Sequence, residues 1–316
     1  MRKNIFLVIV VVIVLIVFGL PFALPLDNSG LQSASDLADP DGVFIDVAGL
    51  QTYVLEQGPV DGEPVVLVHG LFGSTSSWRY NAHVFAAAGY RVIAYDRPGA
   101  GLTEPRADFD YSVANQANFL AALLDRLDIA QARFVAHSAG ANVLAEFALR
   151  YPDRIERQVI VDGATLSGAP PVDVGPLVEF APFNRWGRLA LRTFVTPANL
   201  ASAVRGLQHD ASFWTASDDE SYGRAVRMQD WDVGFIGLVR DRGKTPQPTD
   251  AQLRSITAST LLIWGEADTA TPLDQGRRLA ELFPNTRLIV YPNVGHQPFE
   301  EAAERFNQDV LAFLGE

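Results

Sequence analysis

The stretch Arg133-Phe134-Val135-Ala136-His137-Ser138-Ala139-Gly140 decides the fold, because it joins an apolar strand pattern to a helical pattern over residues 141–149. A turn this sharp accepts only small residues beside the serine, and Ala136 and Gly140 are both small. It leaves the serine hydroxyl above the edge of a sheet and aims the N-terminus of the next helix at the same space. An ordinary strand–turn–helix junction has the same pattern, so this stretch alone leaves the role of Ser138 open.

Two later loops carry the partners that a serine nucleophile requires, namely a histidine base and an acid that orients it. His296 lies in a glycine-containing loop directly after the strand-like run 286–290, and Asp268 follows the buried strand pattern 260–264. The 28 residues from Asp268 to His296 leave room for one helix and one strand. The order Ser138, Asp268, His296 therefore predicts a catalytic triad whose members meet at one sheet edge.

Alternatives exist for the acid and for the other histidines. Asp162 also follows a strand pattern and is a rival acid, while Asp268 has the alternative role of a helix N-cap. His137 is expected to pack beneath the nucleophile as a structural residue. His83 and His209 are expected on the surface, because no partner pattern surrounds them.

Two further motifs extend the pattern: His69-Gly70-Leu71-Phe72-Gly73-Ser74 after one strand, and Asp96-Arg97-Pro98-Gly99-Ala100-Gly101-Leu102-Thr103 after the next. Together with the serine turn and the order of the triad, they resemble the α/β-hydrolase fold superfamily. The resemblance covers nearly everything from about residue 43 to the C-terminus, apart from a middle segment. One position departs from the pattern, since Ala136 stands where the first glycine of the nucleophile turn is usual.

The resemblance also implies roles for backbone groups near Ser138. An oxyanion hole needs two N–H donors that already face the reacting oxygen, and by resemblance these are the amides of Leu71 and Ala139. The remaining motif positions are expected to be structural: His69, Gly70, Asp96 and Gly140.

Alternation of strands and helices predicts an α/β fold with a mostly parallel, doubly wound sheet. Two short alternating runs, 43–47 and 52–56, predict an antiparallel hairpin at one edge. The alternation stops in an aromatic-rich segment, residues 166–248. We predict that this segment forms a helical cap inserted before the last two strands. The α/β-hydrolase core is then expected to comprise residues 43–165 and 249–316.

The first 26 residues differ from the rest. Arg2 and Lys3 precede an apolar run of about 20 residues without charge, which is long enough to cross a bilayer. A membrane anchor is favoured over a cleaved signal peptide, because the only candidate cleavage site, Ser33-Ala34-Ser35, is far from the run. Either alternative leaves residues 27–42 as a linker and puts the catalytic domain outside the cytoplasm, anchored or secreted.

Composition restricts the partners of this chain. The net charge of −12 and the lack of a basic cluster argue against nucleic acid. The chain has no cysteine, and no cluster of residues at metal-ligand spacing is evident, so we expect neither a metal site nor a cofactor.

The leading hypothesis is a serine hydrolase that cleaves a small to medium, largely apolar carboxylic ester through an acyl-enzyme on Ser138. Lactones, thioesters, peptides, carbon–carbon bonds of diketones and cofactor-free perhydrolysis remain alternatives. The carbon–carbon class is less attractive, because its usual small-polar oxyanion loop signature is not evident. A membrane-tethered, non-catalytic binding protein of the same fold is a further alternative.

Overall fold

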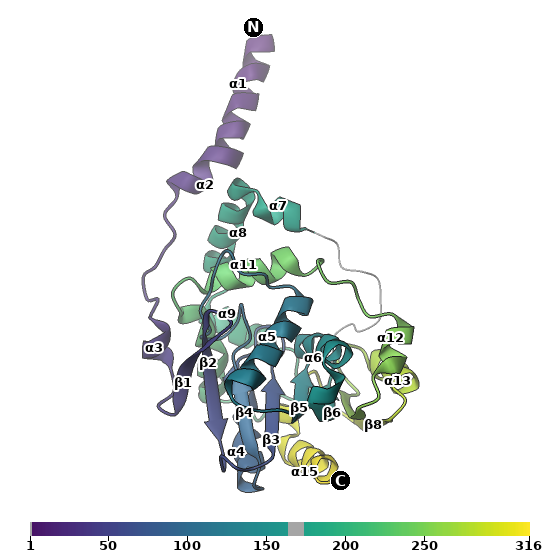
Figure 1. Cartoon of the computed structure of the whole chain (residues 1–316). Helices are drawn as coiled ribbons and strands as arrows, with labels where there is room; N and C mark the ends of the chain where they lie inside the picture. Colours follow the sequence, from purple (N-terminus) through teal and green to yellow (C-terminus); the bar gives the residue numbers. More distant parts are fainter. Residues whose placement is uncertain (1, 164–173) are drawn as a thin grey trace.

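The computed structural model describes residues 2–163 and 174–316, and a single mixed sheet organises them (Figure 1). Its strands lie in the order β1-β2-β4-β3-β5-β6-β7-β8. The first two are antiparallel to their neighbours, and β4, β3, β5, β6, β7 and β8 are parallel. The predicted hairpin edge and mostly parallel sheet are both confirmed.

The strands are β1 (Gly42–Val47), β2 (Leu50–Gln57), β3 (Pro64–Val68), β4 (Arg91–Tyr95), β5 (Ala132–His137), β6 (Ile155–Val161), β7 (Ser259–Gly265) and β8 (Thr286–Tyr291). The helices of the core are η2 (Thr75–Trp78), α4 (Ala82–Ala87), α5 (Val113–Arg126), α6 (Ala139–Arg150), η3 (Pro152–Arg154), α12 (Asp250–Ser255), α13 (Leu273–Leu282), α14 (Pro298–Glu301) and α15 (Ala303–Leu314).

The central strands are apolar on both faces, because helices cover both sides of the sheet. On one face, α5 and α6 contribute Leu120 and Leu144 to a buried cluster. On the other face, α4 and α15 contribute Phe85 and Phe306. This double covering fixes the sheet in the middle layer, with the carboxyl ends of its parallel strands at one edge.

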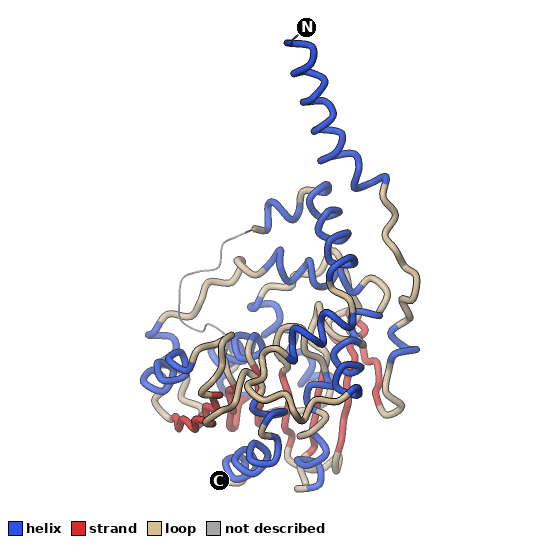
Figure 2. Tube along the Cα trace, turned by 180° about the vertical axis from the view of Figure 1, so that it is seen from behind, coloured by secondary structure: helices blue, strands red, loops and turns tan. Residues whose placement is uncertain are grey.

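Helices follow β6 and precede β7, where the cap was predicted, and Figure 2 shows helices between the strands and the N-terminal helix. They are α7 (Gly175–Glu179), α8 (Ala181–Phe194), α9 (Pro197–Arg205), α10 (Ala216–Gly223), η4 (Ala225–Arg227) and α11 (Trp231–Asp241). Residues 166–173 of the predicted cap lie outside the described residues. The cap packs on the core through its own apolar cluster, which includes Leu200, Tyr222 and Trp231 and reaches Tyr53 and Leu102 of the core.

The N-terminal segment is a helix that projects from the globular part (Figure 1). It consists of α1 (Arg2–Val14), the π-helical turn η1 (Leu15–Gly19) and α2 (Leu20–Ala23). Among the described residues, Asn4–Ala23 is the one helix whose length and apolar composition would allow it to cross a membrane. A signal sequence near an N-terminus meets the same criterion, so the helix alone is weak support for an anchor.

Two details differ from the sequence-based expectations. The sequence of residues 299–314 has a continuous helical pattern, but the helix is interrupted at Ala302, whose backbone angles (φ −128°, ψ 41°) separate α14 from α15. The interruption accompanies hydrogen bonds from the amides of Gly295 and Asp210 to the carboxylate of Glu301. The segment 27–42 is also more than a spacer, because it contains helix α3 (Ala34–Leu37) packed against the cap cluster.

Candidate active site

Ser138 sits at the junction of β5 and α6 in a backbone conformation that is unusual for a residue with a side chain. Its φ is 50° and its ψ is −121°, a region that costs energy and that proteins retain mainly at functional sites. The amide of Ser138 donates a hydrogen bond to the carbonyl of Val161 on β6 at 3.0 Å, which holds the turn against the neighbouring strand. The side chain is thereby presented at the carboxyl edge of the sheet.

The loops after β7 and β8 bring Asp268 and His296 to the same edge. The Nδ1–H of His296 donates to Asp268 Oδ2 at 2.8 Å, and its Nε2 lies 3.1 Å from Ser138 Oγ, from which it can accept a hydrogen bond. Asp268 is anchored by the Thr271 hydroxyl at 2.5 Å and by the amides of Ala270 and Thr271. Burial alone would raise the pKa of Asp268, but the interactions with His296 and Thr271 hold it at about 2.

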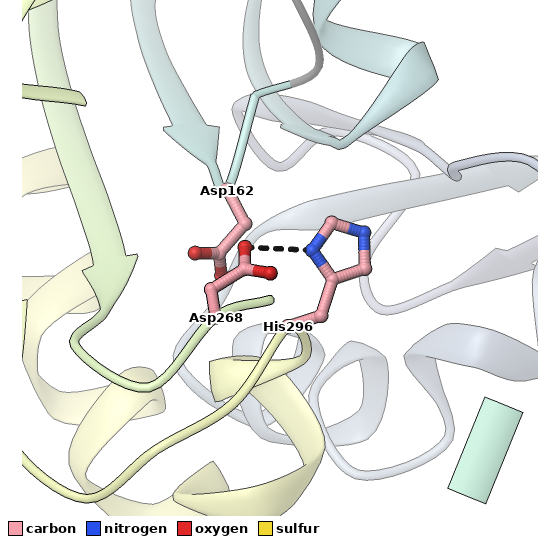
Figure 3. A group of neighbouring side chains, drawn as sticks. All are labelled: Asp162, Asp268 and His296. Carbon is pink, nitrogen blue, oxygen red and sulfur yellow. Dashed lines mark hydrogen bonds and ion pairs between the residues drawn. The ribbon is translucent and has the colours of Figure 1, made fainter. Parts of the chain in front are cut away.

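Asp162, the rival acid, lies beside Asp268 at the end of β6 (Figure 3). Its Oδ1 accepts a hydrogen bond from the amide of Gly265 at 2.9 Å. Burial and the negative charge of Asp268 raise the pKa of Asp162 well above its usual range. Asp162 is therefore the carboxyl group of the two that keeps its proton to higher pH, and Asp268 is the one that ionises more readily next to His296.

Asp162, Asp268 and His296 also form the one group in residues 2–163 and 174–316 with the spacing of a metal site. However, the 2.8 Å contact between His296 and Asp268 is a direct hydrogen bond. A metal ion coordinated by both groups would have to break it. The group therefore fits a hydrogen-bonded acid–base pair better than a metal site.

Close packing explains the two glycines of the predicted motifs. A Cβ on Gly140 would lie 2.5 Å from the carbonyl oxygen of Val68 and 2.6 Å from that of His69. A Cβ on Gly70 would lie 2.8 Å from the His137 ring and 3.0 Å from the Cβ of Ser138. Glycine at both positions therefore lets the loop after β3 approach the serine turn within contact distance.

His69 and Arg97 fix the peptide between Gly70 and Leu71. The Nδ1–H of His69 donates to the Gly70 carbonyl at 2.8 Å, while its Nε2 accepts from the amide of Arg97 at 2.9 Å. Arg97 Nη2 donates to the same carbonyl at 3.2 Å. Burial, together with the charge of Arg97, keeps the pKa of His69 well below its usual range, so the ring is neutral. With the amide of Gly73, which donates to the same carbonyl at 3.3 Å, these side chains orient the N–H of Leu71, which belongs to the same peptide.

Asp96 holds the glycine-rich turn that follows β4. Its two carboxylate oxygens accept hydrogen bonds from the amides of Thr75 and Leu102, both at 2.6 Å. Gly101 has φ +57°, and a Cβ there would fall 2.0 Å from the Asp96 carboxyl group. Burial raises the pKa of Asp96 to about 6, against the effect of the two amide donors.

Sequence reasoning missed the contacts that hold the His296 loop in place. His137 does lie beneath the site, but its Nε2–H also donates to the His296 carbonyl at 2.9 Å. The amide of His296 donates to the carbonyl of Leu207 in the cap at 3.0 Å. The surface residue His209 belongs to the same cap loop, and its amide donates to Glu301. Nothing in the sequence pattern pairs residues 207–209 with residue 296, so only the structure shows that the cap supports this loop.

A cavity of about 360 Å³, which we call the active-site cavity, lies between Leu71 and Ala139 on the core side and α11 on the cap side. Phe235, Leu238 and Val239 form much of the cap wall. The predicted oxyanion residues Leu71 and Ala139 therefore line one space, which reaches the residue after Ser138 in the chain, while Ser138 and His296 are not among its lining residues.

Comparison with known proteins agrees with this architecture. The profile of the family described as "alpha/beta hydrolase fold" matches residues 63–303. The chain belongs to the α/β-hydrolase family. The match covers the serine turn, the acid and histidine loops and the cap, so the protein is a hydrolase of this fold.

Similar proteins include carbon–carbon bond hydrolases. The chain is 33% identical over 261 residues to a 2-hydroxy-6-oxononadienedioate/2-hydroxy-6-oxononatrienedioate hydrolase of Burkholderia vietnamiensis, covering 80% of this chain and 87% of the relative. A solved meta-cleavage product hydrolase is 26% identical, with a TM-score of 0.71, covering 87% of this chain and 98% of that one. An enol-lactonase of Burkholderia xenovorans, 23% identical with a TM-score of 0.70 and coverages of 86% and 100%, shares the fold.

Proposed function

We propose that this protein is a serine hydrolase that cleaves largely apolar carboxylic esters through an acyl-enzyme on Ser138. The observation that carries the proposal is the continuous hydrogen-bonded line from Asp268 through His296 to Ser138, with contacts of 2.8 and 3.1 Å. Each contact lies within the range expected of a nucleophile, its base and the group that orients the base.

The steps follow from the positions of these atoms. His296 Nε2 takes the proton as Ser138 Oγ attacks the ester carbonyl, and Asp268 stabilises the imidazolium that forms. His296 then passes the proton to the leaving alkoxide, and the alcohol departs. Water, deprotonated by His296, attacks the acyl-enzyme and releases the acid, which restores the Ser138 hydroxyl.

The developing negative charge needs donors that are already in place. We assign this role to the backbone amides of Leu71 and Ala139, which border the same cavity. Two donors on the Gly70 carbonyl polarise the peptide that carries the Leu71 amide. This arrangement makes that N–H a stronger donor without any movement during the reaction.

A second candidate function is favoured by Arg97. This side chain is 3% exposed and lines the active-site cavity. Among the described residues no carboxylate forms an ion pair with Arg97, and its Nε has no hydrogen-bond partner. Burial lowers the pKa of Arg97 to about 10, yet the group is still charged at pH 7. A substrate carboxylate would compensate this charge, as in hydrolysis of a carbon–carbon bond in a keto-dienoate.

Trapping of the intermediate tests the ester mechanism. After rapid mixing with p-nitrophenyl butyrate and acid quenching, the mass of the protein should rise by one butyryl group, with the modification on Ser138. Ser138→Ala should show neither the mass increase nor the p-nitrophenol burst. An acyl group on another residue would refute the assignment of the nucleophile.

Variants of Arg97 and Arg242, which both line the active-site cavity, distinguish hydrolysis of a neutral ester from hydrolysis of a keto-dienoate. If Arg97 binds a substrate carboxylate, Arg97→Gln should reduce kcat/KM for a 2-hydroxy-6-oxo-dienoate about 100-fold more than for a neutral ester. Arg242, exposed and also lining the cavity, supplies the control, since Arg242→Gln removes the same charge from the rim. Equal losses for both substrates would assign Arg97 to the support of the oxyanion loop.

We further propose that the first 26 residues anchor the protein in a membrane with the catalytic domain on the extracytoplasmic side. The support is the single apolar helix Asn4–Ala23 and the two basic residues that precede it in the sequence. In flotation of vesicles washed at alkaline pH, which removes protein that is only docked on the surface, the full chain should rise with lipid while a chain starting at residue 27 should stay behind. Secretion of a shortened chain would indicate a cleaved signal peptide instead.

A further inference from the structure

The lower end of the N-terminal helix is fixed to cap helix α8 (Figure 1). The indole Nε1–H of Trp186 donates a hydrogen bond to the carbonyl of Val17 at 3.0 Å. The guanidinium of Arg185 donates to the carbonyls of Pro21 and Leu24, at 3.1 and 2.8 Å. These bonds use backbone carbonyls near the C-terminal end of the apolar helix, so α8 is held next to that end.

The same part of the cap exposes large apolar side chains, which we call the cap patch. Their exposed fractions are 55% for Leu177, 47% for Phe180, 37% for Phe183 and 71% for Phe194. The ring of Phe18, in the N-terminal helix, lies 5.9 Å from Phe180 and 6.5 Å from Phe183. The part of the cap patch around Phe180 and Phe183 is therefore continuous with the apolar helix, and exposed apolar surface of this kind indicates contact with a membrane or a protein.

An apolar groove of about 390 Å³ leads inward from the cap patch, between α8 and α11. One face of α8 lines it at helical spacing, with Phe183, Gly187, Ala190 and Phe194. On α11 the groove is lined by Phe235, Ile236 and Val239. Phe235 and Val239 also line the active-site cavity, so these two side chains lie between the groove and the cavity.

We propose that the cap patch docks on the surface of a lipid bilayer, and that the groove between α8 and α11 admits the apolar chain of a membrane-dissolved ester to Ser138. The substrate class in this inference rests on the proposed ester hydrolysis, whereas the docking does not.

A bilayer fits the cap patch better than a protein partner, because the apolar helix attached to α8 is itself of membrane-spanning length. Docking would bury side chains of the type that insert at the boundary between headgroups and acyl chains. The protein has a net charge of −12, so attraction to anionic lipid does not drive this contact. We therefore expect docking on neutral lipid and little dependence on salt.

The absence of cysteine from the sequence allows a direct test of docking by single-cysteine labelling of the full chain. Phe194→Cys places a bimane fluorophore on the cap patch. Val60→Cys is the matched control, since Val60 is 76% exposed and lies between β2 and β3, at the opposite edge of the sheet from the cap. Both proteins are reconstituted in phosphatidylcholine vesicles with and without brominated acyl chains.

Brominated lipid should quench the label at position 194 at least twofold more than the label at position 60, equally in low and high salt. Equal quenching at the two positions would overturn docking. A label at 194 that is shielded from an aqueous quencher but unaffected by brominated lipid would also overturn it, and would show that a second copy of the chain covers the patch. No outcome depends on turnover, so docking is tested even if the proposed ester hydrolysis fails.

Filling the groove between α8 and α11 tests whether it admits the apolar chain of the substrate. Ala190 lines the groove and is exposed, so Ala190→Trp adds bulk there without disturbing a buried site. For the full chain in vesicles, kcat/KM for p-nitrophenyl dodecanoate should fall about tenfold more than for the acetate, since only the long chain needs the groove. Ala203→Trp, at an exposed position of α9, should change neither. Equal effects of Ala190→Trp on both esters would contradict the proposal that the groove admits the long apolar chain.

Discussion

Two buried carboxyl groups lie beside one histidine, and their pKa values are shifted in opposite directions, with different hydrogen bonds at each. Asp268 accepts from His296, Thr271 and Ala270, which stabilises its ionised form. Asp162 has one amide donor, on Oδ1, and no hydrogen-bond partner for Oδ2 among the described residues. Two adjacent buried carboxylates repel each other, so the proton stays on the group with fewer donors. The sequence could not distinguish them, because both follow strands that end at the same edge.

Substitution of each carboxyl group by its amide tests this assignment. Asp268→Asn should lower kcat about 10⁴-fold, because the amide no longer holds His296 in the tautomer that accepts the serine proton. Asp162→Asn should lower kcat less than tenfold, since His296 makes its hydrogen bond to Asp268 and not to Asp162. Steady-state ester hydrolysis measures both, with circular dichroism as the control for folding. A dead Asp162→Asn and an active Asp268→Asn would reverse the roles.

Asp96 gives the stability a dependence on pH. Its pKa of about 6 in the folded protein, raised by burial, lies above the value near 3.9 of an unfolded chain. The folded state therefore binds the proton more tightly, and the stability gained from it is present below about pH 4 and lost as the pH rises through 6. The loss is about 3 kcal/mol. Urea denaturation from pH 4 to 7 should show this decrease, and Asp96→Asn should flatten it. An unchanged slope in the variant would contradict the shift.

At the scale of elements, the turn between β5 and α6 depends on the approach of the loop after β3. Gly140→Ala would place a Cβ 2.5 Å from the Val68 carbonyl oxygen, and backbone cannot move aside as a side chain can. We expect the free energy of unfolding in urea to fall by about 3 kcal/mol. Gly206→Ala is the control, since its nearest contact would be an ordinary 3.4 Å. Equal stability of the two variants would show that the turn tolerates a side chain.

The positions of the strands were predictable because their apolar runs and flanking glycines are local signals. The runs at 65–68 and 91–95 correspond to β3 (Pro64–Val68) and β4 (Arg91–Tyr95). The break at Ala302 was not predictable, because it accompanies contacts of Glu301 with loops about 90 residues earlier and six residues earlier in the chain. The hydrogen bond from the His296 amide to the Leu207 carbonyl was not predictable either, because the two residues lie far apart in the sequence.

At the scale of the whole molecule, the segment between the apolar helix and β1 belongs to the folded part. Leu37 is buried in the cap cluster, and Asp39 pairs with Arg224 at 2.6 Å and accepts a hydrogen bond from the Tyr53 hydroxyl. A spacer was the natural expectation, since the segment is polar and its few apolar residues show no periodicity. Their burial depends on the cap, which begins more than a hundred residues later in the sequence.

Truncation at two positions tests the role of this segment. A chain starting at residue 41 loses α3 and should be less stable than a chain starting at residue 27 by about 3 kcal/mol, mainly through the loss of buried Leu37. Urea denaturation of both proteins gives the difference. If the two midpoints coincide, the segment is a passive linker.

The most direct test of the central claim is hydrolysis of p-nitrophenyl esters, from acetate to palmitate, by the full chain and by Ser138→Ala. The hydrogen-bonded line from Asp268 through His296 to Ser138 predicts turnover of several chain lengths by the full chain and none above background by the variant. Folded protein without activity on any ester would contradict the proposed ester hydrolysis, and full activity of Ser138→Ala would contradict the role of Ser138.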